Sequence, residues 1–154
     1  MQLKHRLEGL IVNAKKYLGQ AYLINMDITS RLEQLEQLRS LAQRVTTAVG
    51  DVKVQTTKQK SPVENTIIKI VQAEDELNKA IDKLVEAKEN IRKLILKINN
   101  SDYRLLLELR YLCFNSWERI AIKLNCSCNC VYQKHYCAVK EFTRIYNSEV
   151  KEGV

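Results

Sequence analysis

The stretch that decides the fold is SDYRLLLELRYLCFNSWERIAIKLNCSCNCVYQKHYCAVKEFTRIYN, residues 101–147. Its apolar side chains recur at steps of three and four residues in three runs, the spacing of one buried face on an α-helix. Ser116 and Ser127 stand just before the second and third runs, where a hydroxyl can accept a free backbone N–H at a helix start. The stretch therefore predicts three helices, the second beginning at Trp117 and the third spanning residues 127–146.

The second and third of these helices are expected to meet at a tight turn. Ala121 is small where two crossing helices would approach closely, and Asn125 and Cys126 supply the turn. A helix-turn-helix of this kind places its last helix in the major groove of DNA. We therefore predict a DNA-binding helix-turn-helix over residues 101–148, followed by a tail at 149–154.

The face of the third helix that lies opposite its apolar stripe carries side chains that can donate and accept hydrogen bonds at base edges. Cationic side chains on the second helix and beside this face can meet phosphates. The predicted DNA-contacting residues are Arg119, Lys123, Ser127, Asn129, Tyr132, Gln133, Lys134 and Tyr136. The plainer alternative is that the two tyrosines cover apolar surface and Gln133 is solvated. His135 falls on the buried stripe, where a packed histidine is expected rather than a ligand.

Three motifs carry a family resemblance: Y-x-x-L-L-x-L-R-Y from Tyr103, S-W-E-R-I-A-x-K-L from Ser116, and S-x-x-x-V-Y-x-x-H-x-x-A-V from Ser127. Together they resemble region 4 of bacterial sigma factors. They are still more similar to the ArpU-like late-gene regulators of phages and prophages of Gram-positive bacteria. The resemblance implies transcriptional regulation through double-stranded DNA and no enzymatic activity. RNA polymerase is a candidate protein partner of such a regulator.

Residues 1–100 are predicted to form a long antiparallel helical hairpin, a coiled coil with its loop near 47–61. Apolar positions alternate steps of four and three in both halves, and Ser61-Pro62-Val63-Glu64 is typical of a capped helix start. The first half would span about 65 Å at 1.5 Å per residue. The expected seam of the first half is Leu3, Leu7, Leu10, Ala14, Tyr17, Ala21, Ile24, Ile28, Arg31, Leu35, Leu38, Ala42, Val45 and Val49. The expected seam of the second is Ile67, Ile70, Glu74, Leu77, Ile81, Leu84, Lys88, Ile91, Ile95 and Ile98, with Ala73, Ala80 and Ala87 beside it.

The polar seam residues bear on oligomeric state. Glu74 and Lys88 lie two heptads apart, and polar seam residues often select register or partner. They could pair across a homodimer or other homo-oligomer, or with a neighbour such as Arg31. The alternative is a monomer whose helix-turn-helix packs on the hairpin.

The composition agrees with an all-α fold, because four glycines and one proline leave few places for turns. The formal net charge is +7, which suits a polyanionic partner without identifying one. Residues 1–60 hold ten Lys or Arg against five Asp or Glu, residues 61–100 seven against seven, and residues 101–154 eight against six. The surplus therefore lies mostly in the N-terminal part, which leaves open a phosphate-contacting role for that helix.

Other function classes find little support. No apolar run approaches the ~18 residues of a membrane span, so we expect no membrane partner and a location in the cytoplasm of a bacterial host cell. Five cysteines, an odd number, fit a reducing compartment. The C-x-C-x-C spacing of Cys126, Cys128 and Cys130 differs from the C-x-x-C of zinc knuckles, so we expect no metal and no cofactor. Two histidines and no Gly-rich loop argue against an enzyme.

Two function classes remain. In the first, the chain is a sequence-specific regulator that binds DNA through residues 127–146. In the second, the hairpin is a coiled-coil adaptor or inhibitor of a host or phage protein, and the helix-turn-helix is a packing module. Steep salt dependence together with preference for one site separates the first from the second.

Overall fold

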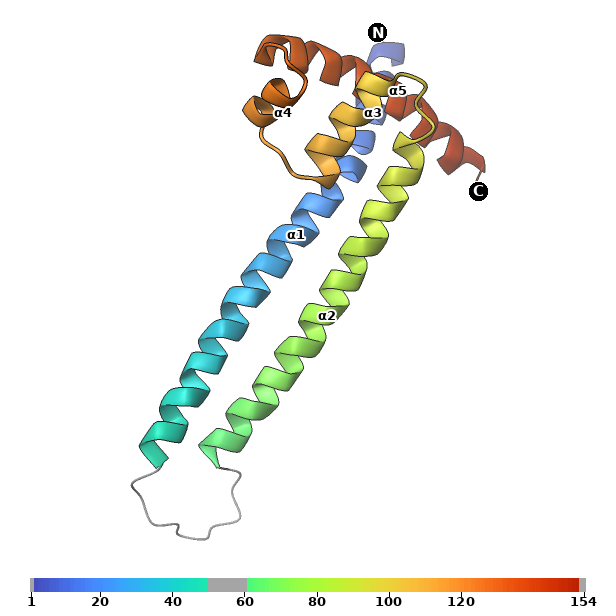
Figure 1. Ribbon diagram of the computed structural model, residues 1–154. Coiled ribbons are helices and arrows are strands. Elements are labelled where there is room, and N and C mark those ends of the chain that lie inside the picture. The colour runs from blue at the N-terminus through green and yellow to red at the C-terminus, as the bar shows by residue number, and fades with distance from the viewer. Residues whose placement is uncertain (1, 50–60, 153–154) are drawn as a thin grey trace. The chain divides into compact units, whose positions relative to one another are not determined.

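The computed structural model describes residues 2–49 and 61–152, with side chains over 8–48 and 61–149. These residues form helices joined by short turns, and no strand occurs among them (Figure 1). Two long helices form a hairpin and four shorter helical segments follow, so the predicted all-α fold is confirmed. Within the same residues, no helix is both long and apolar enough to span a lipid bilayer.

The helices follow the predicted order with changed ends. Their bounds are α1 (Gln2–Val49), α2 (Pro62–Ile95), α3 (Ser101–Leu107), η1 (Glu108–Leu112), α4 (Trp117–Lys123) and α5 (Cys128–Glu152). The η1 segment is a π-helical turn that continues α3. The hairpin loop predicted near 47–61 falls largely outside the described residues. Helix α5 continues to Glu152, through part of the expected tail.

Helix starts follow local hydrogen-bonding chemistry. Ser61 and Glu64 form the predicted capping box, with the Glu64 N–H 3.2 Å from Ser61 Oγ and the Ser61 N–H 3.1 Å from Glu64 Oε2. Ser116 caps α4 by accepting the Arg119 N–H. Asn100 caps α3: its side chain accepts the N–H groups of Asp102 and Tyr103, and Ser101, which the sequence also suggests as the cap, is already helical.

The chain forms two compact units. Unit 1 comprises residues 1–23 and 84–154, and unit 2 comprises residues 24–83. The domain boundary expected at residue 100 falls inside unit 1. The ends of the hairpin helices therefore belong to the same compact unit as the helix-turn-helix.

One hydrophobic core holds unit 1 together, and every helix contributes to it. Phe142 of α5 is fully buried there with Leu18 of α1, Ile95 of α2 and Leu107 of α3. The remaining buried members are Ala14, Ala21, Ile91, Leu94, Ile98, Leu106, Ile120, Ala121, Val131, Ala138 and Val139. Burying large apolar side chains contributes roughly 1.5–3 kcal/mol each. The helix-turn-helix therefore packs on the hairpin ends instead of standing apart.

Unit 2 is the antiparallel pairing of α1 with α2. The predicted α1 seam is confirmed: Ile28 and Leu35 are buried, and Ile24, Leu38, Ala42 and Val45 are partly buried. Arg31, the one polar seam residue, is also partly buried, and its neighbour Leu32 is exposed. The side chains of Leu3, Leu7 and Val49 lie outside the described residues.

The predicted α2 seam was wrong in part. Ile67 and Ile81 are 51% and 40% exposed, whereas Ala80 and Ala87 are buried and Ala73 is partly buried. Leu77, Ile91, Ile95 and Ile98 are buried as predicted. The alanines also lie in the seam, whereas Ile67 and Ile81 flank it. Both sets repeat every seven residues, so spacing alone does not separate them. Small side chains let two helices approach closely, which favours the alanines at the contact.

Two ion pairs join the helices of unit 2. Arg31 lies 2.8 Å from Glu76 and also from Asp27 of its own helix, and Arg39 lies 2.7 Å from Glu74. Glu74 therefore pairs with Arg39. The sequence had suggested Arg31 as a partner, but Arg31 pairs with Glu76 and Asp27. Exposed pairs of this kind add little stability, but they favour one register of α1 against α2.

A matched pair of leucines tests the seam. We expect Leu35→Ala to lower the free energy of unfolding by about 2–5 kcal/mol, because it removes a buried side chain. Leu32→Ala, one turn earlier on the exposed side, should change it by less than about 1 kcal/mol. Urea denaturation followed by circular dichroism measures both, and equal losses would contradict the assignment of the seam.

Candidate nucleic-acid interface

The turn between α4 and α5 has the geometry of a helix-turn-helix. Asn125 adopts a left-handed conformation, with φ 49°, which asparagine tolerates better than most residues. The Cys126 N–H then donates to the Ala121 carbonyl over 3.0 Å. Ser127 accepts the Cys130 N–H at 3.2 Å and so caps α5, as predicted. This short connection fixes the start of α5 against α4.

Burial of one stripe of α5 leaves the opposite face open to solvent. Val131, Ala138 and Phe142 are buried, whereas Tyr132 and Tyr136 are 48% and 57% exposed. The predicted contact residues that are exposed are Arg119, Lys123, Ser127, Asn129, Tyr132, Gln133 and Tyr136. The structure thus brings these seven to the surface of α4 and of the first half of α5.

Lys134 is placed differently from the other predicted contacts. Its ammonium lies 2.8 Å from the Asp102 carboxylate of α3, and its side chain is 33% exposed. The hydrogen bond to Asp102 raises the pKa of Lys134. Lys134 therefore forms an ion pair with Asp102 on the flank of α5 that faces α3. No local sequence pattern predicts this pair, because its partners are 32 residues apart.

An aromatic cluster lies beneath the exposed face. The Trp117 ring lies 5.3 Å from that of Tyr132 and 4.8 Å from that of His135, and the Arg110 guanidinium stacks 4.3 Å from the Trp117 ring. His135 Nε2 shares a 2.8 Å hydrogen bond with the Tyr111 hydroxyl. Sequence reasoning expected a packed histidine but missed the roles of Arg110 and Tyr111. Both lie on the π-helical turn, which apolar spacing does not predict.

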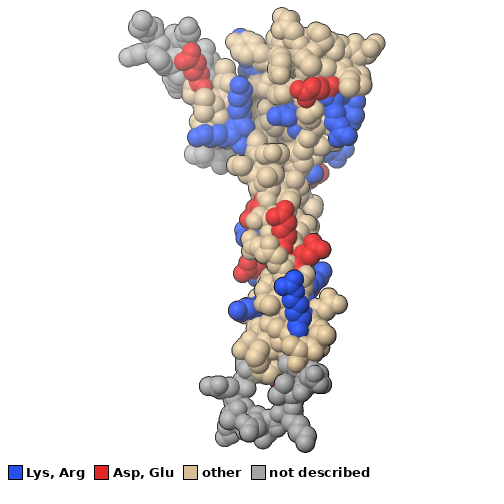
Figure 2. Space-filling view, turned by 90° about the vertical axis from the view of Figure 1, so that its left-hand side faces the viewer, with Lys and Arg blue, Asp and Glu red and all other residues tan. Residues whose placement is uncertain are grey.

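The two units differ in charge. Unit 1 holds 16 Lys or Arg and 9 Asp or Glu, a net +7, whereas unit 2 holds nine of each and is neutral. On the face drawn in Figure 2, Lys and Arg side chains (blue) predominate toward one end, beside a few Asp and Glu side chains (red), and both signs are mixed toward the other end. The N-terminal surplus seen in the sequence includes Lys15 and Lys16 of α1, which belong to unit 1. The entire formal net charge of the chain thus lies in the unit that contains the helix-turn-helix.

The cysteines beside the turn do not gather as metal ligands do. Within residues 2–49 and 61–152, no group of three Cys, His, Asp or Glu side chains could hold a metal ion. All five cysteines are free thiols. Burial and the neighbouring Cys130 thiol raise the pKa of Cys126. A raised thiol pKa lowers the thiolate fraction near neutral pH, so Cys126 is a weak nucleophile.

The family model described as "Protein of unknown function (DUF1492)" matches residues 44–143. The chain belongs to the DUF1492 family. The DUF1492 match spans α2, α3, η1, α4 and most of the buried stripe of α5, and it includes all eight residues predicted to contact DNA. No curated protein and no solved structure matches the chain.

The partly buried His135 predicts a specific pH dependence of stability. Burial, helped by the charges of Lys15 and Arg110, lowers the pKa of His135 from 6.5 to about 4. Between these two values the unfolded chain binds a proton that the folded protein does not, so stability falls as the pH falls through this window. We expect His135 to account for on the order of 1–2 kcal/mol of lost stability between pH 7 and pH 4.5.

Urea unfolding of the protein and of His135→Gln at both pH values measures this loss. His135→Gln should lose less stability than the parent, and His5→Gln, which alters the other histidine, should lose as much as the parent. If the free energy of unfolding depended on pH identically in the parent and in His135→Gln, the claim that the partly buried His135 is neutral in the folded protein would be contradicted.

Proposed function

We propose that this protein is a sequence-specific, DNA-binding transcription regulator that inserts the first half of α5 into the major groove. The observation that carries the proposal is the exposed polar face of α5 on a helix-turn-helix whose unit holds the entire net charge of the chain. Phosphates attract such a surface without regard to sequence, and hydrogen-bonding side chains in the groove select the site.

The roles divide by position. Asn129, Tyr132 and Gln133 lie in the first turns of α5, the part of a recognition helix that meets base edges. Arg119 and Lys123 are exposed on α4, which crosses the backbone in this arrangement. Ser127 and Tyr136 would contact phosphates or bases at the two ends of the same face. Lys134 would contribute only if its pair with Asp102 opened.

The cellular setting rests on the motifs. The resemblance of residues 103–139 to sigma region 4 and to ArpU-like regulators supports a phage or prophage protein that controls late genes. By the same resemblance, RNA polymerase is its protein partner in activation. The chain would act in the cytoplasm of the bacterial host.

Fluorescence anisotropy with DNA fragments from the genome region around the gene tests whether the protein prefers one DNA sequence. We expect one fragment to bind far more tightly than the rest at about 150 mM salt. The double variant Tyr132→Ala, Gln133→Ala should lose that preference and keep weak binding to all fragments. Lys123→Gln should weaken binding to every fragment and reduce the slope of log affinity against log salt by about 1.

Lys69→Gln is the matched control, because it removes the same charge from an exposed position of unit 2. It should leave both the affinity and the salt slope unchanged. Equal, weak binding of all fragments by the parent would overturn the proposal and favour the adaptor alternative.

The exposed apolar side chains of α2 favour a helix–helix contact by unit 2. Ile67 and Val71 are 51% and 57% exposed, and Ile81, two heptads after Ile67, is 40% exposed. Exposed apolar stripes of this kind mark protein contacts. We propose that unit 2 forms a homodimer through this stripe, which would hold two recognition helices for two half-sites. A different helical protein bound at the same stripe is the adaptor alternative.

Light scattering after size exclusion tests self-association. We expect a dimer for the parent and a monomer for the double variant Ile67→Gln, Ile81→Gln, because polar side chains weaken the apolar contact. Leu41→Gln is the control, since Leu41 is 49% exposed on α1. If the parent protein stays monomeric at high concentration, the homodimer proposal is contradicted, and the exposed stripe would then bind a different protein.

A further inference from the structure

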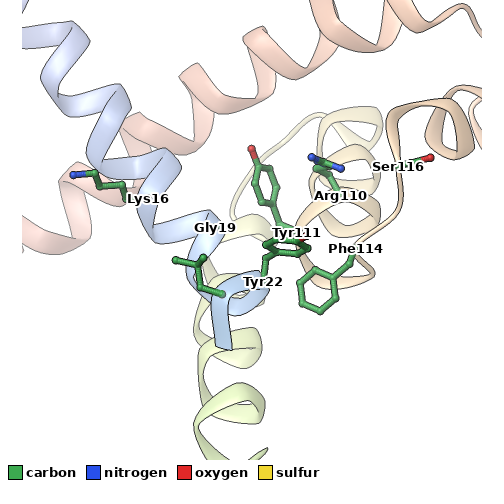
Figure 3. A pocket seen from close by; sticks show the side chains of 8 residues that line it. Lys16, Gly19, Tyr22, Arg110, Tyr111, Phe114 and Ser116 are labelled. Atoms are coloured by element: carbon green, nitrogen blue, oxygen red, sulfur yellow. The ribbon is translucent and has the colours of Figure 1, made fainter. Parts of the chain in front are cut away.

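Unit 1 contains a pocket that neither the core nor the proposed DNA face accounts for. It lies between α1 and the connection from η1 to α4, and its volume is about 710 Å³. Figure 3 shows the rings of Tyr22, Tyr111 and Phe114 grouped on its wall, with Gly19 on α1 and Arg110 at its edge. Pockets of about 300–1,000 Å³ with apolar walls and a few polar groups are typical of small-molecule sites.

The backbone around the pocket is unusual in two ways. The π-helical turn of η1 carries Arg110 and Tyr111, and such turns are frequent at functional sites. Phe114 has φ 56°, a left-handed conformation that is strained for a bulky side chain. Its ring is thereby directed to Tyr22, edge to face at 5.8 Å, and lies beneath the Lys88 ammonium at 4.6 Å. Strain of this kind persists where the surroundings fix it.

The α1 wall of the pocket is open. A Cβ added at Gly19 would meet nothing within 4 Å, so the missing side chain leaves free volume. Tyr22 and Leu23, one turn further along α1, are 49% and 68% exposed. Exposed apolar side chains beside free volume leave an apolar surface in contact with water, which an apolar ligand would cover.

The charged residues that line the pocket are cations. Lys16 and Arg110 line it, no acidic residue is among the lining residues, and neither cation forms an ion pair within the described part of the chain. Arg110 donates one N–H to the Asn115 carbonyl at 2.9 Å and keeps further donors. In Figure 3 the Lys16 ammonium points away from the rings, which places it at the rim on a flexible stem.

We propose that this pocket binds a small apolar organic anion, an aromatic ring system bearing a carboxylate or sulfonate. The rings and Leu23 would cover its apolar body, and Arg110 would take its charge, with Lys16 at the rim. Arg110 and Tyr111 also contact Trp117 and His135, so an occupant would touch the residues that support α5. That link to DNA binding rests on the proposed function, whereas binding in the pocket does not.

The probe is 8-anilinonaphthalene-1-sulfonate, added to the full chain and followed by fluorescence and by calorimetry. Its neutral relative N-phenyl-1-naphthylamine has the same ring system without the sulfonate. We expect saturable binding of the sulfonate at one site, tighter than that of the neutral probe. Gly19→Leu should weaken it at least tenfold by filling the open wall.

Gly9→Leu is the matched control, because Gly9 also lies in α1 with open space at its Cβ but does not line the pocket. Both substitutions replace a helical glycine and should raise the melting temperature. Lys16→Gln and Arg110→Gln should each weaken the sulfonate and leave the neutral probe unchanged, while Lys69→Gln changes neither.

Three results would overturn the proposal. Gly19→Leu could bind the sulfonate as tightly as Gly9→Leu does, which would place the probe elsewhere on the chain. The two probes could bind with equal affinity in every variant, which would show that the pocket does not recognise the negative charge of the ligand. Finally, Gly19→Leu could change the oligomeric mass in light scattering, which would make the pocket a contact between copies of the chain. None of these results depends on whether the protein binds DNA.

Discussion

Burial of one face of α5 is the contact on which the rest of unit 1 depends. Phe142, Val139 and Val131 enter a core that α1, α2 and α3 also supply, so α5 keeps a single rotation about its own axis. That rotation decides which side chains meet solvent: Asn129, Gln133 and the two tyrosines are exposed because the opposite stripe is buried. The same core joins residues 11–21 of α1 to the helix-turn-helix, so Lys15 and Lys16 of α1 lie in the same compact unit as the cations of α4.

Helix α1 therefore serves two different contacts along its length. In unit 1 it presents Leu18 and Ala21 to the shared core, and the adjacent side of the same turns lines the pocket with Gly19 and Tyr22. In unit 2 it follows a narrow heptad seam against the alanines of α2 and is held in register by arginine–glutamate pairs. The net charge divides along the same lines, and unit 2, being neutral, suits association with another helix better than it suits a polyanion.

Much of the fold follows from local signals in the sequence. The capping box at Ser61, the serine caps of α4 and α5 and the seam of α1 all depend on residues a few positions apart, and the structure has each of them. The structural features that the sequence could not predict depend on contacts between residues that are far apart in the chain. Ala80 lies in the seam and Ile81 outside it because of how closely α1 approaches, and Lys134 binds Asp102 across 32 residues. The pocket needs the π-helical turn and the left-handed Phe114, neither of which has a signature in apolar spacing.

The central claim, that the exposed face of α5 meets DNA, is tested most directly by photo-crosslinking. The residue p-benzoylphenylalanine would replace either Tyr132 or Tyr22, two tyrosines of nearly equal exposure, 48% and 49%. Each protein would be irradiated with the fragment that binds most tightly. We expect strong crosslinks to bases from position 132 and almost none from position 22. Equal crosslinking from both positions, or none from position 132, would contradict the account.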